Sequence, residues 1–237
     1  NGNEEWSFVD SNGYIEPTSI QQTIDGGYIM GGIIIPNYYY ALNASDPKIN
    51  SIIKISANGE ESWIQEYNDF YATLGFYNLN VQQSINGSYF ISGASGSLTQ
   101  DTLFSTGLTL IKTWGNGLEQ WSETFLEIDY IDNVFLAYAD GQITNDGGYI
   151  LMGIEREEIY INYESVALAF STHIVKIDEN GNEIWTQSFN EDNTLCLSIK
   201  QTSDDGYIMA GVSSFSYDEY GSFENNAEII LIKIDSE

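Results

Sequence analysis

The sequence predicts an all-β fold, a four-bladed β-propeller with four antiparallel strands in each blade. The first observation is a repeat: the stretch SIQQTIDGGYIMGG at 19–32 recurs at 81–93, 142–153 and 199–211. The second is its regular spacing, because the anchor tyrosines Tyr28, Tyr89, Tyr149 and Tyr207 lie 61, 60 and 58 residues apart. The third is that every copy divides into four short strand-like segments. Four-stranded antiparallel units repeated radially form a propeller.

Each repeat contains the same strands and turns in the same order. A first strand of the SIQQT type is followed by a tight turn in which Gly, Asp or Asn accepts a positive φ. A second strand of the YIMGG type leads through a long connection to a third strand that carries a lysine in an apolar run. An Asn-Gly pair then predicts a two-residue hairpin. The fourth strand begins at a tryptophan, nine residues after the lysine in three of the repeats.

The two ends of the chain predict how the ring closes. The last repeat stops in its third strand, AEIILIKIDSE, whereas the chain begins with the Asn-Gly turn and fourth strand, NGNEEW. We therefore expect Asn1–Asp10 to pair with the C-terminal strand, which removes an exposed sheet edge. The expected blades are about 11–68, 69–126, 127–190, and 191–237 completed by 1–10. A linear β-solenoid or a fragment of a longer array remains the alternative.

Composition narrows the class of partner. The 237 residues are 42% hydrophobic and 14% aromatic, which is typical of one folded domain. Seven basic against 35 acidic residues give a net charge of −28, which argues against nucleic acid and anionic membranes as partners. No apolar run reaches the length of a membrane span, so no membrane insertion is expected. The charge fits a cationic partner, metal ions or simple solubility.

Several conspicuous residues are interpreted as structural. The repeat lysines are expected mid-strand, with their stems packed and their amines on acidic or carbonyl partners. The repeat tryptophans are expected to pack between blades, and Trp114, just before a hairpin, to be partly exposed. The single His173 has no second histidine to share a metal or proton. The single Cys196 excludes an internal disulfide and is expected to be a small buried residue.

Length variation points to one working face. The spacing from tyrosine to glycine and from lysine to tryptophan is constant, whereas the connections between the second and third strands and between blades differ in length. These connections, expected as loops, are 36–50, 94–107, 154–172 and 212–227 within the repeats and 68–78, 126–138 and 189–195 between blades. They are rich in tyrosine and acid, and rigid aromatic side chains suit recognition. The ligand-binding candidates are Tyr38, Tyr39, Tyr40, Tyr71, Tyr77, Tyr130, Asp129, Asp132, Tyr160, Tyr163, Tyr217, Asp218 and Tyr220.

The same loops are the candidate positions for an ion site or for catalytic carboxylates. Oxygen-rich segments such as DYID and SYDEY leave calcium open, but no EF-hand spacing occurs, and no other cofactor is expected. A glycosidase needs two carboxylates at a set separation, which a sequence alone does not show. No nucleophile elbow, phosphate loop or metalloprotease helix is present. We therefore expect no catalytic residues and no enzyme activity.

The repeats resemble the DGGY…NG…W repeats of secreted and surface β-propeller proteins from bacteria and archaea. The sequence departs from that pattern at 86–88 and 204–206, and at Ile143, where the other repeats have glutamine. The resemblance implies an extracellular or cell-surface location, with the chain as a part of a larger one. The predicted function is a non-catalytic module that binds a protein or glycan through the tyrosine- and acid-rich face. A glycan-processing enzyme using paired carboxylates, or a structural spacer domain, are the alternatives.

Overall fold

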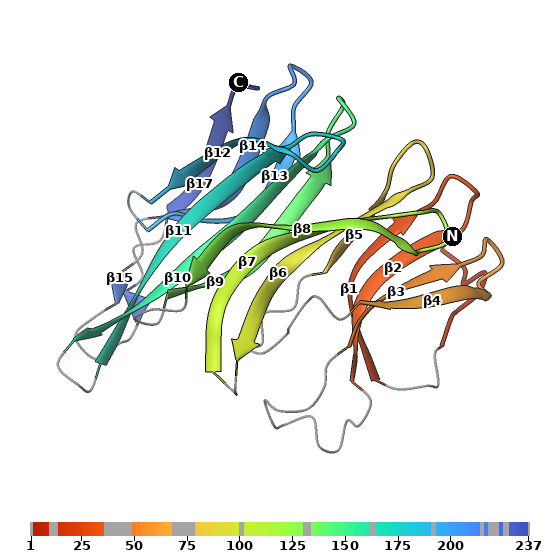
Figure 1. The fold of residues 1–237 in the computed structure, drawn as a ribbon, viewed down its shortest axis with the longest axis horizontal. Coiled ribbons are helices and arrows are strands. Elements are labelled where there is room, and N and C mark those ends of the chain that lie inside the picture. Colours follow the sequence, from red (N-terminus) through yellow and green to blue (C-terminus); the bar gives the residue numbers. More distant parts are fainter. Residues whose placement is uncertain are drawn as a thin grey trace. The chain divides into compact units, whose positions relative to one another are not determined.

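A computed structural model describes most of the chain (Figure 1). The described residues are 2–9, 14–35, 49–67, 79–99, 102–129, 134–161, 165–190, 193–213, 216–217, 223–224 and 228–236. All regular elements within these ranges are β-strands. The described ranges contain no helix that is long and apolar enough to cross a membrane.

Four antiparallel sheets follow one another along the chain, one for each repeat. The first sheet has the order β1-β2-β3-β4, with strands Tyr14–Gln22, Tyr28–Ile35, Ile49–Ile55 and Glu61–Tyr67. The second has the order β5-β6-β7-β8, with strands Asn80–Gln83, Tyr89–Thr99, Thr102–Thr113 and Glu119–Asp129. The third sheet has the order β9-β10-β11-β12, with strands Val134–Ile143, Tyr149–Ile161, Ser165–Ile177 and Glu183–Phe189.

The fourth sheet contains three strands, in the order β13-β14-β17: Leu195–Gln201, Tyr207–Ser213 and Glu228–Ile234. A separate pair is formed by β15 (Ser216–Tyr217) and β16 (Phe223–Glu224). The all-β class and the sheet-per-repeat architecture predicted from the sequence are thus confirmed. Residues 2–9 form no strand, so the pairing expected of Asn1–Asp10 is not seen in the described structure and stays a prediction.

The hairpin turns differ from the predicted two-residue loops. After β3, the Ser56 amide donates to Glu60 O (2.7 Å) and the Gly59 amide donates to Ser56 O (3.0 Å), which encloses three residues. Gly59 has a φ of 83°, and the register shifts by one residue just beyond Lys54. A turn followed by a left-handed residue and a bulge is the usual three-residue hairpin. Glycine is favoured there because it reaches positive φ without steric cost.

Three segments expected as loops are largely strand. The segments 94–107, 126–138 and 154–172 lie mostly within β6 and β7, β8 and β9, and β10 and β11. The register between β10 and β11 continues without a break from Tyr149↔Ile177 to Ile161↔Ser165. The threonines and phenylalanine of 94–107, and the isoleucine, valine and tyrosine of the other two segments, favour strands. The sheet pairing therefore extends beyond the part of the repeat that has constant length.

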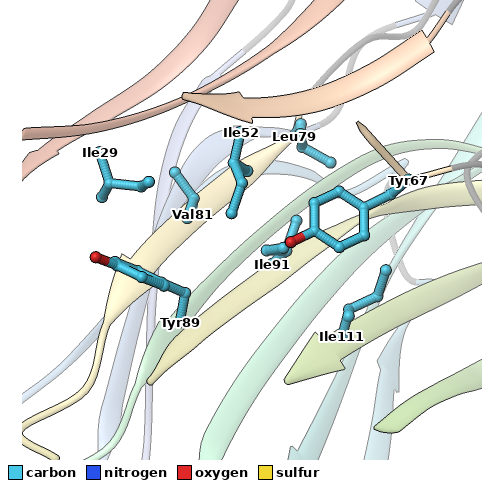
Figure 2. Close-up of a cluster of buried hydrophobic side chains, with 8 residues drawn as sticks. All are labelled: Ile29, Ile52, Tyr67, Leu79, Val81, Tyr89, Ile91 and Ile111. Carbon is cyan, nitrogen blue, oxygen red and sulfur yellow. The ribbon is translucent and has the colours of Figure 1, made fainter. Parts of the chain in front are cut away.

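The chain divides into two compact units. Unit 1 comprises 1–95 and 109–123, and unit 2 comprises 96–108 and 124–237, so the second sheet contributes residues to both. Within unit 1, Ile29, Ile52 and Tyr67 of the first sheet pack with Val81, Tyr89 and Ile91 of the second, and Figure 2 shows these side chains in one cluster. Within unit 2, Ile150, Met152 and Ile174 pack with Ile199, Tyr207 and Met209. Faces of successive sheets therefore form each core.

Candidate functional site

The sequence-predicted ligand residues fall almost entirely outside what the structure describes. Asp129 lies at the end of β8, Tyr160 in β10 and Tyr217 in β15, and the structure describes only their backbone. The remaining candidates lie outside the described residues: Tyr38, Tyr39, Tyr40, Tyr71, Tyr77, Tyr130, Asp132, Tyr163, Asp218 and Tyr220. The predicted loop site, including its calcium option, therefore stays a prediction. The described side chains form a different candidate site, at the turns of unit 1.

The repeat lysine is tied to the first turn of its own sheet. Lys54 is buried, and its Nζ donates to Asp25 Oδ1 (3.1 Å) and to the backbone carbonyl of Ile55 (3.1 Å). Asp25 also accepts hydrogen bonds from the Thr23 hydroxyl and the Gly27 amide (3.0 Å). These bonds, led by that from Thr23 and followed by that from Lys54, lower the pKa of Asp25 from 3.8 to about 2. We call this arrangement the lysine clasp.

The third and fourth sheets carry the same clasp. Lys176 Nζ lies 2.8 Å from Asp146 Oδ2, and Lys233 Nζ lies 3.0 Å from Asp204 Oδ1. A glycine precedes the anchor tyrosine in each clasp, and a Cβ there would lie 2.5 Å from Lys54 Nζ at Gly27 and 2.8 Å from Lys176 Nζ at Gly148. The glycine therefore makes room for the ammonium group. The structural role predicted for these lysines is confirmed.

The second sheet departs from the clasp in a coordinated way. Ser88 stands where the clasp needs glycine, and Asn86 replaces the aspartate and bonds to Ser84 and the Ser88 amide. Lys112 instead lies with its Nζ 5.4 Å from the centroid of the Phe90 ring, a cation–π contact. The sequence departure at 86–88 thus coincides with a contact of the repeat lysine with an aromatic ring.

Side chains bridge the first and second sheets along their inner strands. The Val81 amide of β5 donates to Ser19 Oγ (3.1 Å), and the Gln83 amide donates to Gln21 Oε1 (2.6 Å). In return, Gln83 Oε1 accepts from the Ile24 amide in the first turn (2.8 Å). An edge strand exposes backbone groups that need partners, and these side chains supply them.

Unit 2 repeats this bridge between its own sheets. The Gln201 amide donates to Gln142 Oε1 (3.2 Å), and Gln201 Oε1 accepts from the Asn145 amide (2.8 Å). Tryptophans add to both bridges, because Trp63 packs edge-to-face on Tyr89 with centroids 5.9 Å apart and Trp185 packs likewise on Tyr207 at 6.0 Å. These contacts confirm the packing role predicted for Trp63 and Trp185 and hold the turns of neighbouring sheets against each other, whereas Trp121 packs on Phe90 of its own sheet.

A hollow of about 450 Å³ lies between the turns of unit 1. The aromatic side chains of Trp63 and Tyr89 line it, together with Asp25, Lys54, Gln83 and Asn86 as polar groups. Burial, followed by the charge of Asp25, raises the pKa of Tyr89 to about 12, so its hydroxyl stays protonated. At the rim stand Ile24 and Ile85, which are 70% and 97% exposed. We call this cavity the turn hollow.

The corresponding turns of unit 2 are joined by a hydrogen bond. Asn145 occupies the position of Ile24 and Asp205 the position of Gly87, counted from the anchor tyrosine. Asn145 Nδ2 donates to Asp205 Oδ1 over 3.0 Å, so a polar side-chain bridge links the two turns. Ser203 stands in place of Ile85. The same backbone framework therefore carries apolar turn residues in unit 1 and polar, mutually bonded ones in unit 2.

Apolar exposure in unit 1 continues beyond the hollow. Trp114 and Leu118 close the turn between β7 and β8, where the Trp114 amide donates to Leu118 O (2.8 Å), and they are 58% and 54% exposed. A Cβ at Gly115 would lie 3.2 Å from Gly87 O, so this turn touches the turn that carries Ile85. We use the name turn patch for the four exposed apolar residues Ile24, Ile85, Trp114 and Leu118.

His173 and Cys196 have structural surroundings. His173 Nδ1 lies 2.7 Å from Ser188 Oγ, and Nε2 lies 3.0 Å from Glu155 Oε2. Cys196 is fully buried, and burial raises the pKa of its thiol. Within the described residues, no group of three or more His, Cys, Asp or Glu side chains is placed to hold a metal ion. Both residues fit the structural interpretation drawn from the sequence.

Sequence reasoning missed the turn hollow because it looked for function in segments of variable length. The turns have constant length, so they were assigned to the scaffold. A usable clue was present: Ile24 and Ile85 place isoleucine in a tight turn where other repeats have Asn145 and Ser203. A large apolar residue in an exposed turn is informative when it forms part of a patch.

Comparison with known proteins gives a likeness of fold. No family model matches the chain, and no curated protein sequence matches it. A protein of unknown function from Bacteroides caccae is similar over 96% of this chain and 65% of its own, with 10% identity and a TM-score of 0.50. The chain thus spans just under two thirds of that protein. At this identity the likeness concerns the fold alone.

Two further solved structures come from Leishmania mexicana. A mannose phosphorylase is similar over 97% of this chain and 86% of its own, with 10% identity and a TM-score of 0.31. A GDP-mannose-dependent mannosyltransferase is similar over 94% of this chain and 87% of its own, with 9% identity and a TM-score of 0.37. These scores are too low to carry an argument about function.

Proposed function

We propose that this protein is a non-catalytic binding module that recognises a protein or glycan at the turn hollow of unit 1. The observation that carries the proposal is the contrast between the two units. Equivalent turns carry Asn145, Asp205 and Ser203 in unit 2 but Ile24, Gly87 and Ile85 in unit 1. Folding does not need isoleucine at these positions, because the equivalent turns of unit 2 form with Asn145 and Ser203 instead.

The size and lining of the hollow support this function. Small-molecule and side-chain pockets are commonly about 300–1,000 Å³ and combine aromatic walls with a few polar groups. The turn hollow, at about 450 Å³ with Trp63 and Tyr89 in its lining, has these features. The side chains that line it are held by hydrogen bonds, by the lysine clasp and by edge-to-face aromatic packing. Little side-chain entropy is therefore lost when a ligand binds.

A paired substitution tests the proposal. The double variant Ile24→Asn, Ile85→Ser copies the residues of unit 2 and removes apolar surface from the rim. The full chain is screened against a glycan array and a peptide library, and each hit is measured again with the variant. The matched control is Ile184→Asn, which changes a 55%-exposed isoleucine in unit 2.

We expect the hits to be lost with the double variant and retained with the control. Retention of every hit by the double variant, with an unchanged melting temperature, would place binding away from the turn hollow. The absence of any glycan or peptide hit would contradict the binding function.

We further propose that the four sheets are blades of a closed four-bladed propeller, extracellular or on the cell surface. Its last outer strand is supplied by Asn1–Asp10. Support comes from β17, in which Ile229 and Leu231 are 88% and 66% exposed, whereas the equivalent Leu108 and Leu110 are fully buried. Lys54 and Lys176 pair in register with Trp63 and Trp185 and have side chains 6% and 5% exposed, against 43% for Lys233.

The N-terminal segment has the properties expected of the outer strand that would pair with β17. Trp6 packs edge-to-face on Tyr28 with centroids 5.4 Å apart, as Trp63 packs on Tyr89. Hydrogen exchange tests the closure. Deletion of residues 1–10 is expected to accelerate exchange at the β17 amides, while the β10 amides keep their rates. Equal β17 rates in both chains would contradict the pairing.

A further inference from the structure

We infer that the turn hollow accepts an apolar side chain of a positively charged peptide segment, a partner class more specific than protein or glycan. This inference rests on the proposed function. It starts from the hydrogen bonds of the hollow. Lys54, Gln83 and Asn86 of the hollow are bonded to the scaffold, two exposed isoleucines stand at its rim, and its surroundings are acidic.

The polar groups of the hollow are engaged with one another. Asp25 accepts from Thr23, Lys54 and the Gly27 amide. Gln83 accepts from the Ile24 amide and donates to Gly87 O and to the Tyr89 hydroxyl, each over 3.4 Å. Asn86 bonds to the Ser84 hydroxyl and the Ser88 amide.

A sugar buries several hydroxyls at once, and each buried hydroxyl needs a partner to avoid a desolvation cost. Lys54, Gln83 and Asn86 already make hydrogen bonds within the scaffold, whereas the Asp25 carboxylate is 64% exposed, which suits a cationic partner. The exposed rim instead offers aliphatic surface, with Ile24 at 70% and Ile85 at 97% exposure. Burial of apolar side chains against this rim is favourable without further polar partners. A peptide side chain therefore fits the hollow better than a sugar ring does.

Charge selects the kind of peptide. Acidic residues adjoin the hollow and the turn patch in sequence: Asp25 follows Ile24, Glu61 precedes the lining residue Ser62, and Glu119 follows Leu118. Glu61 and Glu119 are exposed. The described basic residues of unit 1 are Lys54, held in its clasp, and Lys112, stacked on Phe90. With a chain charge of −28, this surface attracts cationic segments and repels acidic ones.

The turn patch extends the contact beyond one side chain. Trp114 and Leu118 lie in the turn that touches the turn of Ile85. An extended segment that places one apolar residue in the hollow can therefore rest further apolar residues on Trp114. Tryptophan is among the residues that contribute most binding energy at protein interfaces. The partner is thus a basic segment with at least two large apolar residues.

The experiment selects short random peptides, displayed on phage, against the full chain. The best peptides are then synthesised and their dissociation constants measured by titration calorimetry. We expect the selected sequences to be positively charged and to contain large apolar residues. The double variant Ile24→Asn, Ile85→Ser is expected to raise Kd by about tenfold or more. The control Ile184→Asn is expected to leave Kd unchanged, and melting curves verify that each variant is folded.

A charge variant separates electrostatic attraction from apolar burial. Glu61→Gln with Glu119→Gln is expected to weaken binding a few-fold at about 0.05 M salt, with the difference disappearing at about 0.5 M. Selection of neutral or acidic peptides, or binding indifferent to this variant, would overturn the inference. Glycan binding that the double variant abolishes would overturn the peptide assignment and leave the proposed function standing. No binding of either class would overturn both.

Discussion

Removal of the carboxylate from a lysine clasp tests how much the clasp stabilises the first turn of its own sheet. Asp146→Asn keeps the size of the side chain but removes the negative charge beside Lys176. The Lys176 side chain is 5% exposed and donates to Asp146 Oδ2 (2.8 Å), Thr144 Oγ1 (3.2 Å) and Ile177 O (3.2 Å). The variant therefore leaves a buried ammonium group with neutral acceptors only.

The expected loss of unfolding free energy depends on how exposed the Lys176 and Asp146 side chains are. A hydrogen bond to a charged group contributes about 1.5–3 kcal/mol when buried, and an exposed ion pair about 0–1 kcal/mol. Because the Asp146 side chain is 57% exposed, screening by solvent reduces the buried value. We expect a loss of about 1–2 kcal/mol in the free energy of unfolding, which lowers the melting temperature by about 2–8 °C in a chain of this size.

The loss depends on pH in a defined direction. Burial acts to raise the pKa of Asp146, but the hydrogen bonds from Lys176 and Thr144 outweigh it, and the folded pKa lies below the ordinary value of 3.8. A carboxyl with a lowered folded pKa stabilises the protein above its unfolded pKa, and this contribution disappears as the pH falls through the folded pKa. The gap between the native chain and the variant is therefore widest near neutral pH and narrows below about pH 4.

Thermal melts by circular dichroism at several pH values measure this gap. Glu61→Gln serves as the control, since it removes one exposed negative charge from a chain of charge −28 and is expected to leave stability nearly unchanged. Asp204→Asn is expected to cost less than Asp146→Asn, because the Lys233 side chain is 43% exposed. Equal losses at pH 7 and at pH 2, or no loss from Asp146→Asn, would refute the role assigned to the clasp.

Three further predictions concern single contacts. Tyr67→Phe removes the buried hydrogen bond from the tyrosine hydroxyl to Gly117 O (2.6 Å) and should cost about 1–2 kcal/mol in denaturant unfolding; an unchanged midpoint would contradict this. Cys196 is fully buried with a raised thiol pKa, so a thiol reagent should modify it only in the unfolded chain, and rapid reaction in the native chain would be the contrary result. Gly211→Ala places a Cβ 2.0 Å from the backbone carbonyl of Leu195 and should cost about 3 kcal/mol or more, whereas a native melting temperature would show that β13 and β14 adapt.

Much of the fold could be predicted because the repeat fixes both spacing and residue type. The four tyrosines, the lysines in apolar runs and the turn glycines placed the strands of all four sheets. The extended hairpin of β10 and β11 was missed because 154–172 lacks the repeat pattern, although its β-branched and aromatic residues favour strands. The three-residue turns were missed because Asn-Gly also occurs where a left-handed glycine such as Gly59 forms a bulge.

The candidate site was harder to predict for a physical reason. The sequence shows which segments vary in length, but it does not show which turns of separate sheets lie side by side. Ile24 and Ile85 are about sixty residues apart, and their common role appears only when Gln83 Oε1 accepts from the Ile24 amide and draws the two turns together. The difference from Asn145 and Ser203 is visible in the sequence, but its meaning depends on that contact.

A hydrogen-exchange footprint shows whether binding occurs at the turns of unit 1. Exchange is measured on the full chain with and without the best selected peptide. We expect protection of the backbone amides at 23–27, 84–88 and 113–118, with exchange at the turns of unit 2 unchanged. Protection confined to the segments 36–50 and 68–78, where the sequence predicts tyrosine-rich loops, would contradict binding at the turn hollow and favour the loop face instead.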